Sequence, residues 1–487
     1  MAYPLEIARS QRFSSTKRYT VSLLTIRLVF IFCIASLLFF TPSESNALEP
    51  VDKKVSLDEC IAIALENAST TKKAENSLRL QGADILRSYG NFLPKISASA
   101  SYIPYSLSRS YTDLTGSANQ TKKIKTKSET IDLTLTTSLN IFNGFRDYAS
   151  LQAALKREDA GRFSLSRAKQ AIVFDVTQAY YQVLLNQEIL AITRENLLST
   201  KDQLTLTDRQ FQIGLKSMID LYQQQAEAAN SELSVIQAEN QLERSRLELL
   251  RRLRIDPLTR LTLAPVPKNL FTTLPENIDI NALIAAGLEK RPDLKGAELE
   301  TRAAKWQITQ YRGALYPKFD LNFNISTSGT ESLSRSIGGD TIDYSYPPLL
   351  DQLENLTGYS VVLSMNWAIF DGFQTRYAIE QAKINYLNQR LDYDDLKSDI
   401  QIELQQAASE YSAARKSIES AKTNLKAARA AYEGIKRKYD LGAAGFVELS
   451  TSRAALFSAM SSLSQATYTL ALQKNTLDFA TGNVPIY

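Results

Sequence analysis

A long internal duplication constrains the fold of this chain more than any other feature. The motif IFNGF at residues 141–145 recurs as IFDGF at residues 369–373, about 228 positions later. The motif FQIGL at residues 211–215 recurs as YDLGA at residues 439–443 with the same offset. This repeat is far longer than a solenoid unit, so we predict two similar halves that supply the same parts to one assembly.

The composition favours long regular elements and argues against an enzyme. Of the 487 residues, 44% are apolar, and only 18 are glycine and 14 are proline. Histidine is absent, which excludes histidine-based acid–base catalysis and histidine metal ligands. The sequence contains no glycine-rich phosphate loop, no cysteine pair at metal spacing and no G-x-S-x-G motif. We therefore predict no catalytic residue, no metal and no cofactor.

Residues 1–47 have the features of an export signal. Basic residues precede an apolar run at 28–40, and Ser45-Asn46-Ala47 offers a cleavage site of small residues. The alternative is an uncleaved anchor, but about 13 unbroken apolar residues are fewer than the roughly 20 that a spanning helix needs. Cleavage after Ala47 is expected. It leaves Cys60 as the only cysteine of the mature chain and excludes an internal disulfide.

Each half is predicted to contain one very long helix, at 145–211 and at 373–440. The first stretch lacks proline, and the second carries apolar residues in alternating steps of three and four. A continuous helix of about 67 residues is a rod of roughly 100 Å. Helices at 216–254 and 446–481, in which apolar residues recur every seven positions, return along these rods. We expect the hairpins to pack against each other and against neighbouring subunits.

Four segments between the helices alternate apolar and polar residues. They lie at 95–111, 128–142, 318–330 and 358–370, preceded by a helix at 55–91 and by helices at 279–315. About ten alternating residues match a tilted transmembrane strand. Four strands cannot close a barrel, and open edges are not tolerated in lipid. We therefore predict a shared barrel, with a filled interior if two chains contribute eight strands and with a duct if three contribute twelve.

These features together resemble the TolC-like outer-membrane efflux family. The resemblance covers nearly the whole mature chain and depends on the duplication, the order of elements and the two motif pairs. It implies a fold that is mainly α with transmembrane β, divided into halves at 48–277 and 278–487. Three chains would share a twelve-stranded barrel in the outer membrane and a helical tunnel across the periplasm. The implied partners are two further copies, outer-membrane lipid, a periplasmic adaptor and an inner-membrane transporter, without nucleic acid.

The function implied by the resemblance is a passive exit duct, as in efflux pumps and type I secretion. It would export small molecules or secreted proteins, and the energy would come from the transporter. The alternative is a membrane-anchored structural coiled coil without a channel, and the alternating strands argue against it. Because the pump largely selects the cargo in such systems, we predict no particular cargo.

The resemblance also assigns roles to residues in the two apolar turns and after them. The turns match the tips at which adaptor hairpins dock, although a glycine there also ends a helix. The turn residues are Ile213, Gly214, Leu215, Leu441, Gly442 and Ala443. Tyr439 and Asp220 match a tyrosine–aspartate bond that holds the gate closed, and Glu448 matches an acidic ring. Ala444 and Thr451 replace an arginine and an acidic residue of the family, which predicts a weaker clasp and a less charged ring.

Two further motifs lie near the predicted strands. At the corners, Asn143 and Asp371 are expected to cap the helices that follow, and adjacent glycines to permit the turn. A lysine run, Lys122, Lys123, Lys125 and Lys127, is placed in the loop between the first two strands. Most such runs are solvated; on an outward-facing loop they are also positioned to meet lipopolysaccharide phosphates. Both interpretations stay open at this point.

Overall fold

The structure, a computed structural model, describes residues 54–113, 121–259, 261–265, 279–342 and 347–484. The predicted export signal and the predicted boundary between the halves lie outside these ranges. The elements follow in the order β1 (Lys54–Val55), α2 (Leu57–Asn67), α3 (Ser69–Gly90), β2 (Lys95–Asp113), β3 (Thr121–Phe142), α4 (Arg146–Gln212), α5 (Met218–Leu253), β4 (Thr262–Leu263), α6 (Ile280–Lys290), α7 (Pro292–Arg312), the 3-10 helix η2 (Gly313–Leu315), β5 (Lys318–Ile337), β6 (Asp340–Ile342), α8 (Leu349–Asn355), β7 (Gly358–Asn366), α9 (Gln374–Asp440) and α10 (Phe446–Ala480).

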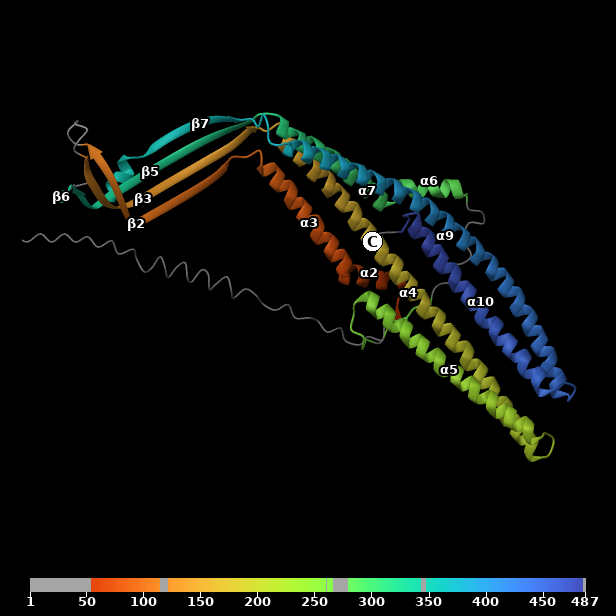
Figure 1. Ribbon diagram of the computed structural model, residues 1–487. Helices are drawn as coiled ribbons and strands as arrows, with labels where there is room; N and C mark the ends of the chain where they lie inside the picture. Colours follow the sequence, from red (N-terminus) through yellow and green to blue (C-terminus); the bar gives the residue numbers. More distant parts are fainter. Residues whose placement is uncertain (1–53, 114–120, 260, 266–278, 343–346, 485–487) are drawn as a thin grey trace, which may run out of the picture. The chain divides into compact units, whose positions relative to one another are not determined.

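Two helices of 67 residues, α4 and α9, form the frame of the helical region. Helix α4 contacts α3, α5, α7 and α10, and α9 contacts α6, α7 and α10 (Figure 1). Each long helix is therefore flanked by a shorter helix near the strands and by a returning helix near its other end. Among the described residues, no helix combines the length and the apolar content that crossing a membrane requires.

The helix predicted over residues 55–91 is wrong as a single element. It consists of α2 and α3, which are separated at Ala68, where the backbone is extended with φ −63° and ψ 121°. Ala68 is buried beside Cys60, Ile61 and Ala64 in the main hydrophobic cluster. The chain therefore bends where α2 packs on α4. The second half has the same break at Arg291, directly before Pro292, whose ring disfavours helical backbone in the preceding residue.

The main hydrophobic cluster surrounds the middle of α4. Val176, Tyr180 and Val183 are at most 1% exposed and pack with residues of α2 and α5. The Tyr180 hydroxyl donates to the carbonyl oxygen of Ala264 at 2.5 Å and lies 3.3 Å from that of Val55. These carbonyls flank the short parallel pair β1–β4. The tyrosine thus attaches the chain segments on either side of the first half to its long helix.

A group of ion pairs, which we call the four-helix junction, joins α4, α7, α9 and α10. Arg291 forms two hydrogen bonds with Asp293, at 3.0 and 2.6 Å, and an ion pair with Glu403 of α9. Arg167 of α4 lies 3.5 Å from Asp293 and 3.7 Å from the centroid of the Phe479 ring. Both arginines also donate to carbonyl oxygens at the end of α10. The junction thus fixes the end of α10 against the other three helices.

The sheet contains four long antiparallel strands in the order β2-β3-β5-β7, and the short β6 also pairs with β5. Strand β2 is irregular between Ile103 and Ser106, where Pro104 provides no backbone N–H for the ladder. Helix α8 covers β5 between the residues that pair with β7 and those that pair with β6, where the Gln352 side chain bonds both the N–H and the carbonyl of Thr330. Helices α4 and α9 begin at the same end of the sheet, where β3 and β7 end (Figure 1).

Four strand limits differ from the prediction, and the smallest difference is at β2, which ends at Asp113 and not at residue 111. Strand β7 ends at Asn366 and not at residue 370, because Asn366 pairs with Lys318, the first residue of β5, and no partner lies beyond it. Strand β5 continues to Ile337, beyond the predicted residue 330. Strand β3 begins at Thr121, not at residue 128. The lysine run therefore belongs to a strand that pairs with β2 along the whole run and with β5 at Lys125 and Lys127.

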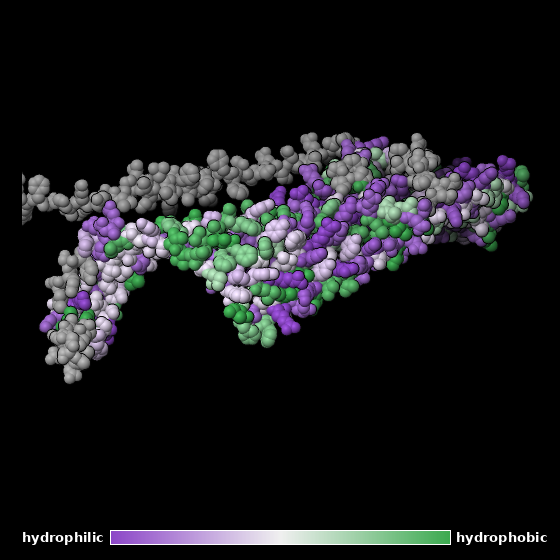
Figure 2. All heavy atoms as spheres, turned by 90° about the horizontal axis from the view of Figure 1, so that it is seen from above, coloured by the Kyte–Doolittle hydropathy of each residue, from purple (hydrophilic) through white to green (hydrophobic). Residues whose placement is uncertain are grey.

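The sheet has one apolar face and one polar face. Tyr359, Leu363 and Met365 of β7 are 59–80% exposed on the apolar face. A hydrophobic patch covers this part of the strands in Figure 2. On the polar face, Ser101 donates to Asp132 at 3.1 Å and Asn140 to Asp320 at 3.2 Å. An exposed apolar face opposite a hydrogen-bonded polar face is the pattern of a transmembrane barrel wall.

Candidate functional site

The two tip turns have nearly identical geometry. In the first, the N–H of Gly214 donates to Phe211 and that of Leu215 to Gln210, at 2.9 and 2.8 Å. This pair of bonds defines a Schellman motif, and the second turn repeats it with Gly442. The φ angles of the two glycines are +79° and +76°. Glycine is required there by backbone conformation alone, since an added Cβ would meet nothing within 4 Å.

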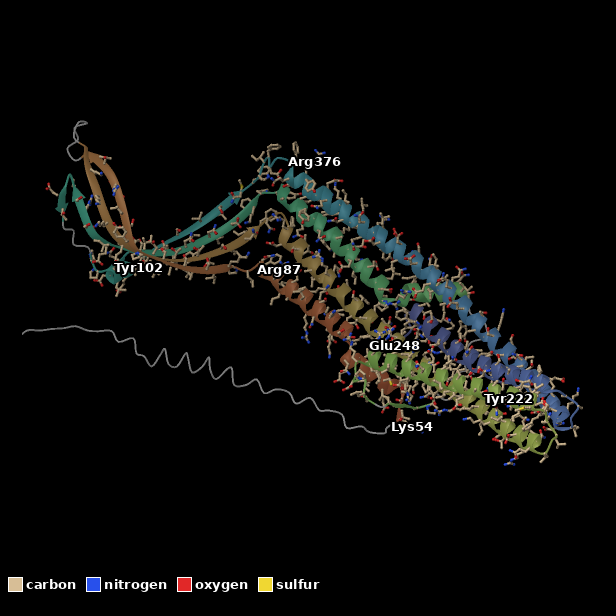
Figure 3. The ribbon with its side chains drawn as sticks, turned by 60° about the horizontal axis from the view of Figure 1, so that its bottom comes forward. Lys54, Arg87, Tyr102, Tyr222, Glu248 and Arg376 are labelled. Carbon is tan, nitrogen blue, oxygen red and sulfur yellow. The ribbon has the colours of Figure 1, made fainter. Side chains whose placement is uncertain are left out.

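The predicted docking residues are the most exposed apolar side chains near the turns. Ile213 is 71% exposed, Leu215 is 70% exposed and Leu441 is 85% exposed. Tyr222, on the helix that leaves the first turn, is 55% exposed as well (Figure 3). Each turn therefore presents apolar side chains that are largely exposed in the described chain. Their role in docking stays a prediction.

Asp220 has a local role that sequence reasoning missed. Its carboxylate accepts hydrogen bonds from the Ser217 N–H at 3.1 Å and from the Ser217 hydroxyl at 2.8 Å. Ser217 accepts in return from the Asp220 N–H, which completes a capping box at the start of α5. These hydrogen bonds, with the charge of Lys216, lower the pKa of Asp220. The S-x-x-D spacing was the available signal.

Tyr439 does not bond to Asp220 within the chain. The tyrosine is 5% exposed, and its hydroxyl has no hydrogen-bond partner among the described residues. Its ring instead lies under Lys216, with 4.4 Å between the ammonium nitrogen and the ring centroid. Lys216 follows the first tip and Tyr439 precedes the second, so this contact links the two hairpins. No pattern in the sequence pointed to Lys216.

The remaining gate positions lie on the first turns of α10. Glu448 is exposed and stands at the third position of the helix, where a carboxylate is favoured by the helix dipole. Thr451 donates to the carbonyl of Val447 at 2.8 Å and leaves its position uncharged. The cap residue Gly445 supplies no side-chain hydrogen bond, in contrast to Ser217. The first turn of α10 therefore lacks the side-chain cap that stabilises the first turn of α5.

A groove of about 690 Å³ separates the ends of α4 and α9 near the tips. Its lining includes Gln203, Gln210 and Tyr439, and each has a buried polar atom without a partner among the described residues. Arg453 of α10 is 2% exposed, and two of its nitrogens likewise have no partner in that part of the chain. Unsatisfied buried polar groups cost about 1–3 kcal/mol each. The hairpin ends therefore meet through polar groups that lack partners within the described chain, whereas the middle of α4 lies in an apolar cluster.

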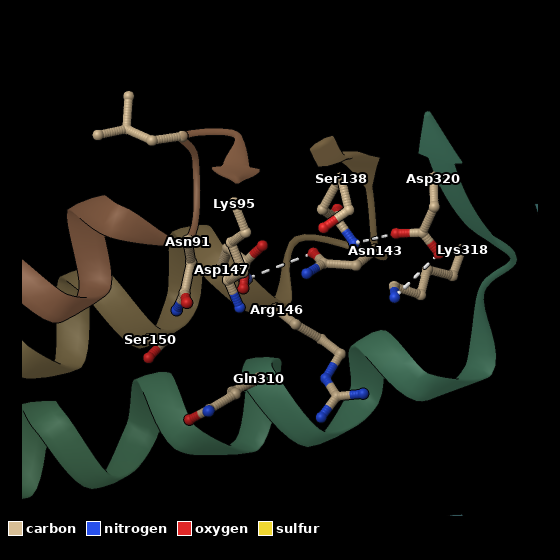
Figure 4. A pocket seen from close by; sticks show the side chains of 12 residues that line it. Asn91, Lys95, Ser138, Asn143, Arg146, Asp147, Ser150, Gln310, Lys318 and Asp320 are labelled. Atoms are coloured by element: carbon tan, nitrogen blue, oxygen red, sulfur yellow. Dashed lines mark hydrogen bonds and ion pairs between the residues drawn. The ribbon is translucent and has the colours of Figure 1, made fainter. Parts of the chain in front are cut away.

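The strand-to-helix corner forms a second pocket, of about 390 Å³ (Figure 4). Lys318 pairs with Asp320 at 2.9 Å, whereas Lys95 and Arg146 form no ion pair with any described residue. Within the described ranges, no group of three or more His, Cys, Asp or Glu is placed to hold a metal ion. Charged side chains therefore line the region where the polar face of the sheet meets the helices.

The corner itself is a backbone feature. Gly144 has φ +69°, and an added Cβ would lie 2.3 Å from the carbonyl oxygen of Gly313. As predicted, Asn143 accepts from the Asp147 N–H at 3.3 Å, and Asp371 accepts from the Thr375 N–H at 2.8 Å. These side chains satisfy donors in the first turns of α4 and α9.

Comparison with known proteins agrees with this architecture. The family model for the outer membrane efflux protein matches residues 60–253 and 283–483, one segment in each half. The chain is 21% identical to the outer membrane protein TolC of Escherichia coli (strain K12) over 447 residues, 87% of this chain and 85% of that protein.

Two solved structures share the fold. The outer-membrane channel OprN has a TM-score of 0.72 at 21% identity, with 88% of this chain and 89% of that chain covered. The Campylobacter jejuni CmeC outer membrane channel also has a TM-score of 0.72, at 18% identity, with coverage of 88% and 85%. The predicted architecture of long helical hairpins with a transmembrane sheet is confirmed. The chain belongs to the outer membrane efflux protein family and lies in the outer membrane, from which it extends into the periplasm.

Proposed function

We propose that three copies of the chain form one outer-membrane exit duct. The observation that carries the proposal is the sheet, which has an apolar face, a polar face and two outer strands, β2 and β7, whose far edges are unpaired in the described chain. Unpaired edges are not tolerated in lipid. Four long strands from each of three chains give twelve, enough for a barrel with an open interior.

Exposed apolar side chains on the helices support assembly with further copies. Leu80 and Leu86 of α3 are 72% and 74% exposed. Tyr377, Ile384 and Leu391 recur every seven residues on α9 and are 50–70% exposed. Exposed apolar residues at seven-residue spacing on a long helix are typical of surfaces that pack against another helix. We infer that neighbouring subunits cover them and continue the helical layer into a tunnel.

The tips are proposed to dock a periplasmic adaptor, which connects the duct to an inner-membrane transporter. The exposure of Ile213, Leu215 and Leu441 supports this role. For the gate, the geometry favours Lys216 as the partner of Tyr439 within one chain. Asp220 acts through the cap of α5, and Glu448 contributes to an acidic ring. The duct is proposed to export small molecules or secreted proteins and to have no chemistry of its own.

Single-particle imaging of the detergent-extracted mature protein tests the assembly. We expect a threefold tube more than roughly 100 Å long, with a detergent belt around one end. A monomer or a twofold particle without that belt would contradict the shared barrel and would favour a structural coiled-coil scaffold. Conductance through the isolated protein in a planar bilayer would then separate a duct from a closed assembly.

Leu441→Asp tests the docking surface. The side chain is 85% exposed, so the substitution should preserve the fold and the trimer and reduce export in cells. Leu258→Asp is a matched control, because that leucine is 88% exposed and lies after α5, away from the tips. Normal export with Leu441→Asp, or an equal loss with both variants, would remove the tip from the docking surface.

A further inference from the structure

The lysine run lies on the same face of β3 as the apolar residues that face the membrane. Side chains alternate along a strand, so Lys123, Lys125 and Lys127 share a face with Leu133 and Leu135. The ladders shift register between the lysines and the leucines, but the extra residues belong to β2, between Ile103 and Ser106, and to β5, so the alternation along β3 itself is unbroken. The lysines therefore point outward from the sheet, away from its polar face.

Neighbouring strands add groups to this face. Residues directly opposite each other in a ladder share a face. Arg109 of β2 stands opposite Lys125, and Ser334 and Ser336 of β5 stand opposite Lys127 and Lys125. We name Arg109, Lys123, Lys125 and Lys127 the basic patch. Within the described part of the chain, none of the four forms an ion pair, and all except the half-buried Lys127 are exposed.

Two carboxylates separate the basic patch from the apolar residues. Glu129 of β3 stands opposite Glu331 of β5 on the outward face. The Tyr102 hydroxyl lies 3.4 Å from Glu129, and its ring lies on the strands (Figure 3). An aromatic ring with a polar end is typical of the membrane–water boundary. The four cations exceed the two carboxylates, so the face has a net positive charge.

The distances place the patch at the level of lipid headgroups. Strand residues rise about 3.3 Å each, so Lys127 lies roughly 7 Å beyond Glu129 along the strand. A tilt of about 40° reduces this to roughly 5 Å along the membrane normal. The helices leave from the opposite ends of the strands at Lys95 and Phe142. Because the helices extend into the periplasm, the basic patch lies on the side of the outer leaflet.

We propose that the basic patch binds the phosphate groups of lipopolysaccharide in the outer leaflet. Lysine, arginine and serine side chains are suitable phosphate donors. The four cations lie on the face that carries the lipid-facing residues. A phosphate partner in the membrane explains this outward orientation, whereas lysines that only contact water could lie on either face. The inference does not depend on the number of chains in the barrel, because the face is defined within one sheet.

Titration of the delipidated, detergent-solubilised mature protein with bisphosphorylated lipid A tests this proposal. The test variant combines Arg109→Gln, Lys123→Gln, Lys125→Gln and Lys127→Gln. The control variant removes four exposed cations from α9 and combines Lys416→Gln, Lys422→Gln, Lys426→Gln and Arg429→Gln. We expect at least a roughly 30-fold loss of affinity in the test variant and less than about twofold in the control. Circular dichroism and particle size should match the parent protein in both.

Further binding measurements distinguish lipopolysaccharide phosphate from other anions. Removing the two carboxylates with Glu129→Gln and Glu331→Gln should strengthen lipid A binding, and dephosphorylated lipid A should bind weakly. Unchanged lipid A affinity in the test variant would overturn the proposal. Equal binding of phosphatidylglycerol would overturn the assignment to lipopolysaccharide in favour of any anionic lipid, and full competition by millimolar inorganic phosphate would overturn it in favour of a free anion. If the fourfold variant does not fold, Arg109→Gln with Lys125→Gln provides the same comparison with a smaller loss.

Discussion

Replacing Arg291 with methionine should loosen the four-helix junction. The Arg291 side chain is 5% exposed, and its partners Asp293 and Glu403 are 23% and 39% exposed. Its guanidinium also donates to the carbonyl oxygen of Ala480 at 3.3 Å. Methionine fills much of the same volume but leaves both carboxylates without this cation. The change therefore removes one charge from the N-terminal end of α7. It also leaves Glu403 of α9 and the carbonyl of Ala480 in α10 without the hydrogen bonds that Arg291 donates.

The expected loss follows from burial. Breaking a buried ion pair by removing one partner costs about 3–5 kcal/mol. Glu403 is more than one-third exposed and can regain water, so the lower end of this range applies, about 3 kcal/mol. Because the thermal midpoint of a large chain moves little per kcal/mol, the expected decrease is roughly 5 °C.

Circular dichroism at 222 nm, recorded at one heating rate in detergent, measures this decrease. Arg302→Met is the matched control on the same helix, because the Arg302–Glu298 pair is 59% and 48% exposed. Such a surface pair contributes about 0.5 kcal/mol, which predicts a shift below about 1 °C. If Arg291→Met lowers the midpoint no more than Arg302→Met does, the ion pairs do not stabilise the junction and the reasoning from burial is refuted.

Three other predictions concern acidity, the gate and the cysteine. Burial alone would raise the pKa of Asp293, but hydrogen bonds from Arg291 and the charge of Arg167 lower it. The charged Asp293 carboxylate therefore stabilises the fold above about pH 4, and this stabilisation disappears below that pH, which acid unfolding measures. Lys216→Met should raise the open-to-closed ratio roughly two- to fivefold in single-channel recordings, and unchanged recordings would exclude the contact with Tyr439 as a closing link. Burial, with a smaller effect of Glu59, raises the pKa of Cys60 to about 12, so maleimide should label it at pH 8 only upon unfolding; rapid labelling of the native protein would contradict this burial.

Much of the fold followed from local patterns. The long helices could be predicted because residues 145–211 and 373–440 lack proline and have a continuous helical period. Alternating residues revealed the strands, and two glycine motifs revealed the turns. These signals work because helix and strand periods place side chains on one face whatever the surroundings.

The predicted limits of strands and helices are wrong where a neighbouring element of the fold determines the limit. Asn366 ends β7 because β5 offers no residue beyond Lys318, and nothing in β7 itself indicates that limit. The bend at Ala68 depends on packing against α4, without a proline to announce it. The bond between Asp220 and Tyr439 stays a prediction; within one chain Asp220 bonds Ser217, whose hydroxyl is 2.8 Å away.

The sequence by itself determined the duplication, the helical hairpins, the membrane-type strands and the apolar turns, because each depends on residues close together in the chain. Only the tertiary structure decided which groups meet. It placed Lys216 over Tyr439, joined α7, α9 and α10 through Arg291, and turned Lys125 outward beside Arg109. These contacts join residues far apart in sequence, and the strand register and helix packing that create them are settled only when the whole chain folds.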